Sequence, residues 1–389
     1  MAEFDIILYG ATGFTGRLVA EYLAQHYRDG SLRWAMAGRS LSKLEQVRDE
    51  IGAPADTPLL TAGADDPAAL KALAERASVI ITTVGPYQLH GEPLLAACAQ
   101  TGTAYVDLCG EPAWMRAMID RHEATAKASG ARIVFSCGFD SIPFDLGVWF
   151  VQAEAQRRFG RPAPRVKGRI RAMKGTFSGG TFASAKASMA AAANDPSILK
   201  LMIDPFALAP GFAGPHQPNG MVPHYDDAVA AWVAPFMMAV INTKNVHRTN
   251  FLAGQPYGAD FRYDEMMVVP GLGEVGRAAA EALAKLNPMS GDMGPAPGEG
   301  PSREARESGH YDIAFVAEMS SEERVTVSVK GDRDPGYGST SKMIAEAELC
   351  LLRDVPSEGK GGIWTPGALM PEALKQRLEA HAGLTFTVE

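Results

Sequence analysis

The sequence has few cysteines, and their spacing excludes several kinds of site. Four cysteines among 389 residues are too few and too scattered for a disulfide framework, and no CxxC pair occurs. The spacing of a Cys-rich zinc site or a thioredoxin-like redox centre is therefore missing. The HExxH, GxSxG and P-loop patterns are also missing, so we expect neither a bound metal nor the common hydrolase sites. The cysteines are Cys98, Cys109, Cys137 and Cys350.

Positive charge and long apolar runs are scarce as well. The formal charge is −8, and no Lys/Arg cluster is interleaved with aromatic residues, which argues against a nucleic acid as partner. The longest apolar run, from about Ala228 to Ile241, is interrupted by Pro235 and falls short of the ~20 residues that span a bilayer. The N-terminus lacks a basic stretch, so we expect no signal peptide. We expect a reduced, cytoplasmic protein, and we leave peripheral membrane contact and a homodimer open.

The first third of the chain alternates short apolar runs with helical stretches, which is typical of a parallel sheet flanked by helices. The length allows two domains. We predict six strands, over Phe4–Tyr9, Leu32–Ala37, Pro58–Thr61, Val79–Val84, Ala104–Leu108 and Ile133–Ser136. The helices between them are predicted over Arg17–Tyr27, Leu41–Ile51, Pro67–Glu75, Glu92–Thr101 and Ala113–Ser129. This alternation favours an α/β protein with an N-terminal Rossmann-like doubly wound parallel sheet.

The pattern changes after about Asp145, where we expect a second, α+β substrate domain. Residues 204–227 and 287–309 are rich in Gly and Pro, and we predict irregular loops there, the second of them exposed or mobile. Strands are predicted over Val166–Met173, Tyr311–Glu318 and Arg324–Val329, the last two as a hairpin. Helices are predicted over Gly179–Ala193 (closely packed), Ala228–Ile241 (buried and kinked at Pro235), Ser339–Leu352 and Pro371–Ala382. The expected domains are 1–145 for the first sheet, 146–338 for the substrate domain, and 339–389 for C-terminal helices that pack back on the first domain.

A glycine-spaced turn joins the first predicted strand to the first helix. Gly10 permits a sharp exit from the strand, Gly13 lets the backbone approach a pyrophosphate, and Gly16 lets the helix pack close to the sheet. The amides of the helix N-terminus then point at the anion. A plain tight turn is the alternative, but the position after the first strand of an α/β domain favours dinucleotide binding. The residues that we assign to the phosphate site are Gly10, Thr12, Gly13, Phe14, Thr15 and Gly16.

The end of the second predicted strand indicates which dinucleotide binds. A site for NAD places Asp or Glu there, about 20 residues after the turn, to hold the ribose hydroxyls. This chain has Arg39, followed by Ser40 and Lys43. An Arg at this place can stack on adenine and pair with a 2′-phosphate. A solvated Arg at a helix start is the alternative, but the missing acid favours NADPH over NADH, and the GxxGxxG spacing is common where the cofactor is NADP.

Further segments give a more specific resemblance. Together they resemble the saccharopine dehydrogenase-like oxidoreductase family, in particular its bacterial branch that includes the trans-acting enoyl reductases of lipid synthesis. The resemblance covers nearly the whole chain, but it specifies a substrate poorly. The segments that carry it are Val84-Gly85-Pro86-Tyr87, Tyr105-Val106-Asp107-Leu108, Cys137-Gly138-Phe139-Asp140-Ser141-Ile142-Pro143, Ser178-Gly179-Gly180-Thr181, Ala234-Pro235-Phe236, Ile241-Asn242-Thr243, Asp334-Pro335-Gly336-Tyr337-Gly338 and Gly361-Gly362-Ile363-Trp364-Thr365-Pro366.

Three of these segments follow predicted strands of the first sheet, where ligands of open α/β sheets bind. We expect Gly85, Pro86 and Tyr87 to approach the ribose and nicotinamide. We expect Gly138, Phe139 and Asp140 to wall the nicotinamide pocket, although a core role for Phe139 is equally open. Asp107 is expected to cap a neighbouring loop rather than to act in catalysis.

No residue stands out as the catalytic acid. The chain has no Tyr-x-x-x-Lys, so a short-chain dehydrogenase site is not expected. The candidate proton donors near the cofactor segments are Tyr87, His90 and Ser141, and Asp140 is a candidate orienting group. Cys137 has no visible activating partner and is interpreted as part of the wall.

The substrate is expected to be a small molecule, and a hydrophobic one would suit the apolar residues between Met202 and Met238. The resemblance implies that Ser178, Gly179, Gly180 and Thr181 face the interdomain cleft, where they could hold an anion or a carbonyl; a flexible turn is the alternative. Arg169, Arg171 and Lys174 lie nearby in the sequence, pointing either into the cleft or to solvent.

Three functions remain open at this point. The first is an NADPH-dependent reductase of an acyl-linked or enoyl substrate in lipid metabolism. The second is a reductase of an amino-acid-derived imine, which is the saccharopine-like chemistry. The third is a sensor or scaffold that binds NADPH without turnover.

Overall fold

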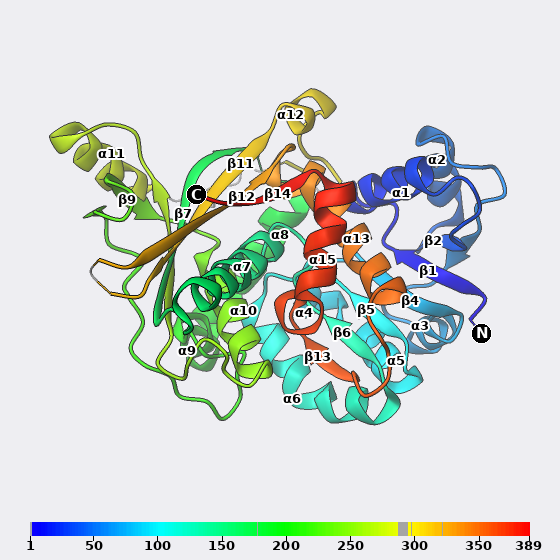
Figure 1. The fold of residues 1–389 in the computed structure, drawn as a ribbon. Coiled ribbons are helices and arrows are strands. Elements are labelled where there is room, and N and C mark those ends of the chain that lie inside the picture. Colours follow the sequence, from blue (N-terminus) through cyan, green and yellow to red (C-terminus); the bar gives the residue numbers. More distant parts are fainter. Residues whose placement is uncertain (1, 177, 287–294, 297, 321) are drawn as a thin grey trace.

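Two seven-stranded sheets organise the chain, one in each half (Figure 1). The structure is a computed structural model, and it describes residues 2–176, 178–286, 295–296, 298–320 and 322–389. The first sheet has the strand order β13-β6-β5-β4-β1-β2-β3, and all of its neighbouring strands are parallel. This order is that of a doubly wound dinucleotide-binding sheet, and it confirms the predicted fold class.

The predicted strands and helices around the first sheet are all present, and the structure adds a seventh strand and the short helix α4. The seventh strand, β13, comes from near the C-terminus and pairs with β6, so the local pattern of the first third did not contain it. The strands are β1 (Phe4–Tyr9), β2 (Trp34–Gly38), β3 (Leu59–Thr61), β4 (Ala77–Thr82), β5 (Ala104–Val106), β6 (Arg132–Val134) and β13 (Gly362–Trp364). The helices are α1 (Phe14–His26), α2 (Leu41–Glu50), α3 (Pro67–Ala74), α4 (Tyr87–His90), α5 (Glu92–Thr101) and α6 (Pro112–Ser129).

The second sheet is mixed, with the order β14-β12-β11-β7-β10-β9-β8. Helices α7 and α10 pack against it, and the hairpin of β11 and β12 confirms the prediction. Its strands are β7 (Arg165–Lys174), β8 (His224–Asp226), β9 (Ala231–Pro235), β10 (Arg262–Val268), β11 (His310–Glu318), β12 (Arg324–Gly331) and β14 (Leu384–Val388). The helices of this half are α7 (Ile142–Phe159), α8 (Gly179–Asn194), α9 (Pro196–Ile203), α10 (Ala239–Leu252), α11 (Gly273–Lys285) and α12 (Arg303–Glu307).

The C-terminal segment contacts both halves. Helix α13 (Thr340–Arg353) packs on α1, β4 and β5, while α15 (Pro371–Arg377) contacts α13 and α7. Short turns complete the segment: the π-helical turns Pro335–Ser339 and Leu378–Ala382, and α14 (Pro366–Leu369). One core cluster runs without a break from Ile6 of β1 through Phe144 of α7 to Phe315 of β11, so the two halves share a core.

Two sequence predictions need correction. The segment Ala228–Ile241 is not a kinked helix: β9 occupies its middle, pairs antiparallel with β10, and ends at Pro235, and α10 begins at Ala239. A proline is tolerated at a strand end but not inside a helix, which explains the break. Helix α8 forms as predicted but is not closely packed, because Gly179 is its only buried residue.

Helix α7 was not predicted, and one predicted loop is only partly described. The α7 helix is buried on most sides, so it shows no amphipathic period by which the sequence could indicate it. Within the expected loop 287–309, residues 303–307 form α12, and residues 287–294 and 297 lie outside the described part of the chain.

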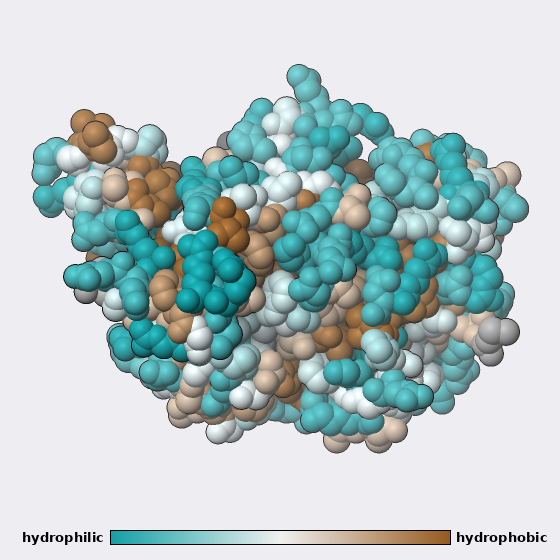
Figure 2. Space-filling view, viewed as in Figure 1, coloured by the Kyte–Doolittle hydropathy of each residue, from teal (hydrophilic) through white to brown (hydrophobic). Residues whose placement is uncertain are grey.

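The surface seen in Figure 2 is mostly hydrophilic, with apolar side chains exposed on the projecting α11. Leu272 and Val275, at the start of that helix, are among the most exposed apolar residues. Within the described part of the chain, no helix is long and apolar enough to cross a membrane.

Candidate active site

The glycine-rich turn after β1 brings α1 close to the end of the sheet. Gly10 has a φ of +92°, and a Cβ there would lie 2.7 Å from Cγ2 of Val84. A Cβ on Gly16 would lie 2.1 Å from the carbonyl oxygen of Gly10. Only glycine fits these two positions, because any side chain would push the helix away from the turn.

The N-terminus of α1 suits an anion. Gly13 is exposed at the cap position, no side chain caps the helix, and its first turn has no acidic residue. The free amides and the helix dipole therefore favour negative charge at this end. Thr12, Phe14 and Thr15 are partly exposed beside it. The turn thus has the space and the donors that a dinucleotide pyrophosphate needs.

The corner at the end of β2 carries the basic residues predicted from the sequence. Arg39 and Lys43 are exposed, and no hydrogen bond or ion pair of Arg39 is found among the described residues. Ser40 caps α2, because its Oγ accepts a hydrogen bond from the Lys43 amide. Burial raises the pKa of Tyr9 to about 12 and the nearby Arg39 charge opposes this rise, so the guanidinium lies close to the end of β1.

Tyr87 is buried and both functions of its hydroxyl are used. The hydroxyl donates to the carbonyl oxygen of Thr82 at 3.1 Å and accepts from the Leu108 amide at 3.1 Å. The ring lies 5.6 Å from that of Trp114, and burial raises the pKa of the hydroxyl well above its ordinary value. These contacts join the ends of β4 and β5, which favours an anchoring role for Tyr87 over proton donation.

Sequence reasoning missed the carboxylate that holds this segment. Glu111 accepts hydrogen bonds from the amides of Tyr87 and Gln88, at 2.9 and 2.8 Å, and thereby caps α4. His90 is exposed at the far end of that helix, and Gly85 is exposed before it. Asp107 accepts from the Cys109 and Ser136 amides, as expected for a residue that caps a neighbouring loop.

Gly138 and Phe139 face the core after β6. A Cβ on Gly138 would lie 2.8 Å from Leu108 and 2.9 Å from Thr340. The ring of Phe139 is buried, with its centroid 4.9 Å from that of Tyr311. The packing therefore favours the core role for Phe139 that the sequence left open.

A buried polar cluster begins at the next residue. The Oδ1 atom of Asp140 is buried without a partner among the described residues, and Ser141 accepts a hydrogen bond from Asn245 of α10 at 2.8 Å. One turn earlier on α10, Asn242 donates to Glu265 of β10 at 3.0 Å. Sequence reasoning did not select Asn242, Asn245 or Glu265, although the two asparagines are three residues apart and so share one helix face.

The turn Ser178–Thr181 lies beside the phosphate turn. Ser178 caps α8 by accepting from the Thr181 amide, and the hydroxyl of Tyr337 contacts both residues. The Tyr337 ring lies 5.2 Å from that of Phe14. Gly179 donates its amide to Glu299, and Gly180 is exposed. This turn therefore connects the second half of the chain to the start of α1.

The arginines of β7 do not face this region. Arg169 is fully buried in ion pairs with Asp226 at 2.7 Å and Asp264 at 3.1 Å. Arg171 pairs with Asp312 and Glu389. Lys174, the third basic residue, donates to Ser308. Because the charges of Arg169 and Arg171 are matched by the protein itself, these two side chains are poor candidates for binding an acidic substrate.

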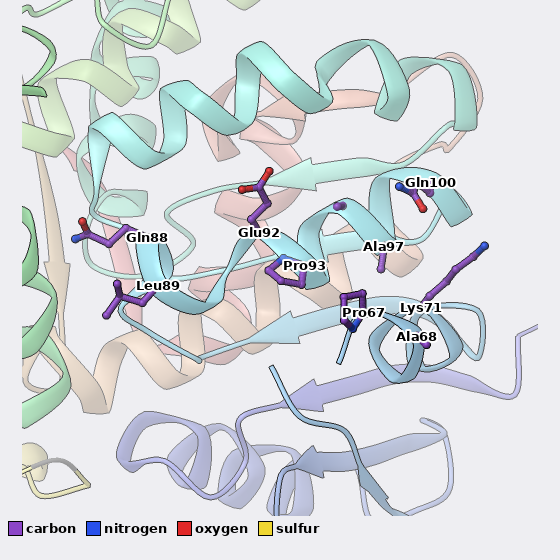
Figure 3. A pocket seen from close by; sticks show the side chains of 10 residues that line it. Pro67, Ala68, Lys71, Gln88, Leu89, Glu92, Pro93, Ala97 and Gln100 are labelled. Atoms are coloured by element: carbon purple, nitrogen blue, oxygen red, sulfur yellow. The ribbon is translucent and has the colours of Figure 1, made fainter. Parts of the chain in front are cut away.

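An open groove of about 690 Å³ lies elsewhere, between α3 and α5 (Figure 3). Lys71 and Pro67 border it on one side, Glu92 and Gln100 on the other, with Leu89 at one end. None of the residues that the sequence assigned to the cofactor, to catalysis or to the substrate lines this groove.

Comparison with known proteins agrees with the geometry of the glycine turn. Residues 6–134 match the model of the saccharopine dehydrogenase NADP binding domain. The chain is 37% identical to the trans-acting enoyl reductase of Mycobacterium leprae and 38% identical to that of Mycobacterium ulcerans, covering 97% of this chain and 96% of each relative. It is 41% identical, over 99% of its length and 97% of the relative, to a Mycobacterium tuberculosis protein provisionally named a trans-acting enoyl reductase.

Solved structures share the fold at low sequence identity. The apo saccharopine dehydrogenase (L-Glu forming) of Saccharomyces cerevisiae superposes with a TM-score of 0.54 at 11% identity, covering 99% of this chain and all of that one. The homospermidine synthase of Legionella pneumophila gives 0.55 at 9% identity, covering 100% and 92%. The cofactor is NADP, and the chain belongs to the saccharopine dehydrogenase-like family of NADP-dependent oxidoreductases, together with the trans-acting enoyl reductases.

Proposed function

We propose that the protein reduces a carbon–carbon double bond conjugated to an acyl carbonyl, with NADPH as the reductant. The observation that carries this proposal is the buried polar cluster after β6, around Asp140 and Glu265. Its Asp140 follows β6 at the carboxyl end of the first sheet, where a nicotinamide is expected, and the unpartnered atoms of the cluster suit a polar acyl group. The names of the relatives support the same chemistry.

In this proposal the first half of the chain binds the cofactor. The turn Gly10–Gly16 holds the pyrophosphate, and Arg39 pairs with the 2′-phosphate, with Ser40 and Lys43 beside it. Gly85 and Pro86 give the backbone room near the nicotinamide, whereas the space beside Gly138 is filled by Leu108 and Thr340. The cofactor supplies a hydride, and the protein supplies position and electrostatics.

The second half covers the substrate. Helix α8 lies over the end of β4, where Gln88 donates to Ser188 at 3.3 Å and a Cβ on Gly85 would lie 3.4 Å from Ser184. Its N-terminal turn, Ser178–Thr181, is the proposed partner of a thioester or phosphate group. Apolar side chains of α8 and α9 are exposed, among them Met189 and Ile203, and they suit an acyl chain from lipid metabolism.

The imine alternative finds less support. A dicarboxylic amino acid needs free basic groups, whereas Arg169 and Arg171 are already paired with acidic residues of the protein. The non-catalytic alternative is distinguished from the proposed function only by turnover.

The experiment is to offer NADPH with trans-2-enoyl thioesters of several chain lengths, and with cyclic and amino-acid-derived imines. We expect NADPH oxidation with the enoyl thioesters only. With NADPH deuterated on the transferred position, mass spectrometry should find the label at the β-carbon of the product. NADPH binding without oxidation of any compound would instead support the sensor or scaffold.

A further inference from the structure

Glu265 of β10 is a buried carboxyl group with one bound and one unbound oxygen. Its Oε2 accepts the hydrogen bond from Asn242, and its Oε1 has no partner among the described residues. The hydroxyl of Tyr263 lies beside it, and both side chains lie over Gly168, where a Cβ would be 2.8 Å from the hydroxyl and 3.1 Å from Cγ of Glu265. The bare backbone of Gly168 thus makes the space for this pair.

Other unsatisfied atoms belong to the same cluster. The Oδ1 atoms of Asn242, Asn245 and Asp140 are buried and lack partners within the described part of the chain. Both asparagines and Glu265 are fully buried, while Asp140 is partly exposed. Each unsatisfied buried polar group costs about 1–3 kcal/mol, so several of them in one place indicate a site that a polar ligand completes.

The charge state of the cluster suits proton donation. Burial raises the pKa of Glu265 well above its ordinary range, the Asn242 hydrogen bond and the neighbouring Tyr263 hydroxyl lower it, and the charges of Asp140 and Asp264 raise it further. Burial also raises the pKa of Asp140, to about 7. Burial therefore favours the protonated form of Glu265, which would carry its proton on the unbound oxygen.

We propose that Glu265 is the catalytic acid of the reduction and that Asp140 forms the entrance by which the acyl group reaches it. This inference rests on the proposed function. The hydride adds to the β-carbon, and the electron pair of the double bond moves toward the acyl oxygen. The Oε1–H bond of Glu265 then breaks as a new C–H bond forms at the α-carbon. Glu265 is left as a carboxylate, which the Asn242 hydrogen bond stabilises until a proton from solvent returns by way of Asp140.

The chain contains a matched control. Glu348 of α13 is also fully buried, and neither of its carboxylate oxygens has a partner among the described residues. Burial raises its pKa well above the ordinary range, as it does for Glu265. However, α13 packs on α1, β4 and β5 and does not contribute to the cluster. The two residues thus share burial and charge state and differ in position.

The first experiment compares Glu265→Gln with Glu348→Gln in the full-length protein. We expect both variants to fold and to bind NADPH with unchanged affinity, measured by cofactor fluorescence. Enoyl thioester reduction should fall about 10²- to 10⁴-fold in Glu265→Gln, as is typical for loss of a general acid, and stay unchanged in Glu348→Gln. Glu265→Asp, which keeps the acid, should recover part of the loss.

A second measurement does not depend on turnover. Infrared spectroscopy at neutral pH should show a protonated-carboxyl band that disappears in Glu265→Gln, and a saturated acyl thioester should shift this band. The band that disappears in Glu348→Gln should not respond to the same compound.

The outcomes separate the inference from the function on which it rests. No product from any enoyl thioester with the unmodified protein would overturn the proposed function. Normal turnover by Glu265→Gln, or equal losses in the two variants, would overturn the assignment of Glu265 while leaving the proposed function intact. The assignment of Glu265 would also be overturned if the infrared band of its protonated carboxyl group were missing at neutral pH, or if the saturated acyl thioester did not shift this band.

Discussion

The hydrogen-bond partners of a side chain determine which role it can have in this protein. Tyr87 and Glu265 can both release a proton, yet their surroundings differ. The hydroxyl of Tyr87 both donates and accepts a hydrogen bond, while Glu265 keeps one oxygen without a partner among the described residues. Because a proton donor must be able to contact its substrate, the second arrangement suits catalysis better.

Arg39 provides a prediction at the residue scale. Arg39→Ala should weaken NADPH binding about ten- to hundredfold, because charge-assisted hydrogen bonds to a phosphate contribute about 1.5–3 kcal/mol. NADH binding, which lacks the 2′-phosphate, should hardly change. Titration of both cofactors by fluorescence measures the difference. Arg33→Ala is the control, since Arg33 is exposed before the start of β2 and pairs with Asp5. Equal losses for the two cofactors would contradict the role of Arg39.

At the scale of elements, the turn before α13 links the N-terminus of α8 to the start of α1. Asp334 accepts hydrogen bonds from the Tyr337 and Gly338 amides, and it thereby shapes the π-helical turn Pro335–Ser339. The turn aims the Tyr337 hydroxyl at the first residues of α8 and its ring at Phe14. Since Gly179 is the only buried residue of α8, the helix depends on polar contacts such as these to hold its N-terminus.

Tyr337→Phe should therefore loosen α8 while leaving the ring packing intact. Removal of the hydroxyl deletes its contacts with Ser178 and Thr181, at a cost of about 1 kcal/mol. Hydrogen exchange of the amides at 178–182 should accelerate several-fold. Tyr311→Phe removes another buried hydroxyl, which contacts Ser339, and should leave α8 unchanged. Unchanged exchange in Tyr337→Phe would show that other contacts hold the helix.

At the scale of the whole molecule, the C-terminal segment and the shared core join the two sheets. Strand β13 extends the first sheet and β14 the second, although only the 19 residues 365–383 lie between the two strands. The same shared core buries several carboxyl groups for which the described part of the chain offers no paired cation. Burial raises the pKa of Asp107 and of Asp145 to about 7, and that of Glu348 well above its ordinary value.

These groups predict how stability depends on pH. An acid whose pKa is raised on folding binds its proton more tightly in the folded protein than in the unfolded chain. Its contribution to stability is therefore complete below the pKa of the unfolded chain and is lost as pH rises through the pKa of the folded protein. The unfolding temperature should thus rise as pH is lowered from about 8 to about 5. The unfolding temperature should fall at still lower pH, where protonation breaks the ion pairs of other carboxylates. Ion pairing lowers the pKa of Glu154 to about 2, and partners that include Arg169 lower the pKa of Asp226 to about 2. Calorimetry should find that the unfolding temperature of Glu348→Gln changes less between pH 8 and pH 5 than that of the unmodified protein. Identical pH profiles would contradict the raised pKa of Glu348.

The amino-acid sequence by itself determined the features that depend on local pattern. The alternation of the first third predicted the doubly wound sheet, and the turn at Gly10–Gly16 with Arg39 predicted NADP, because strand exit, helix start and charge are properties of neighbouring residues. Only the tertiary structure brought Asp140, Asn242 and Glu265 into one cluster, since they come from three segments more than 20 residues apart. The roles proposed for these groups rest on their burial and missing partners, and both depend on packing between distant parts of the chain.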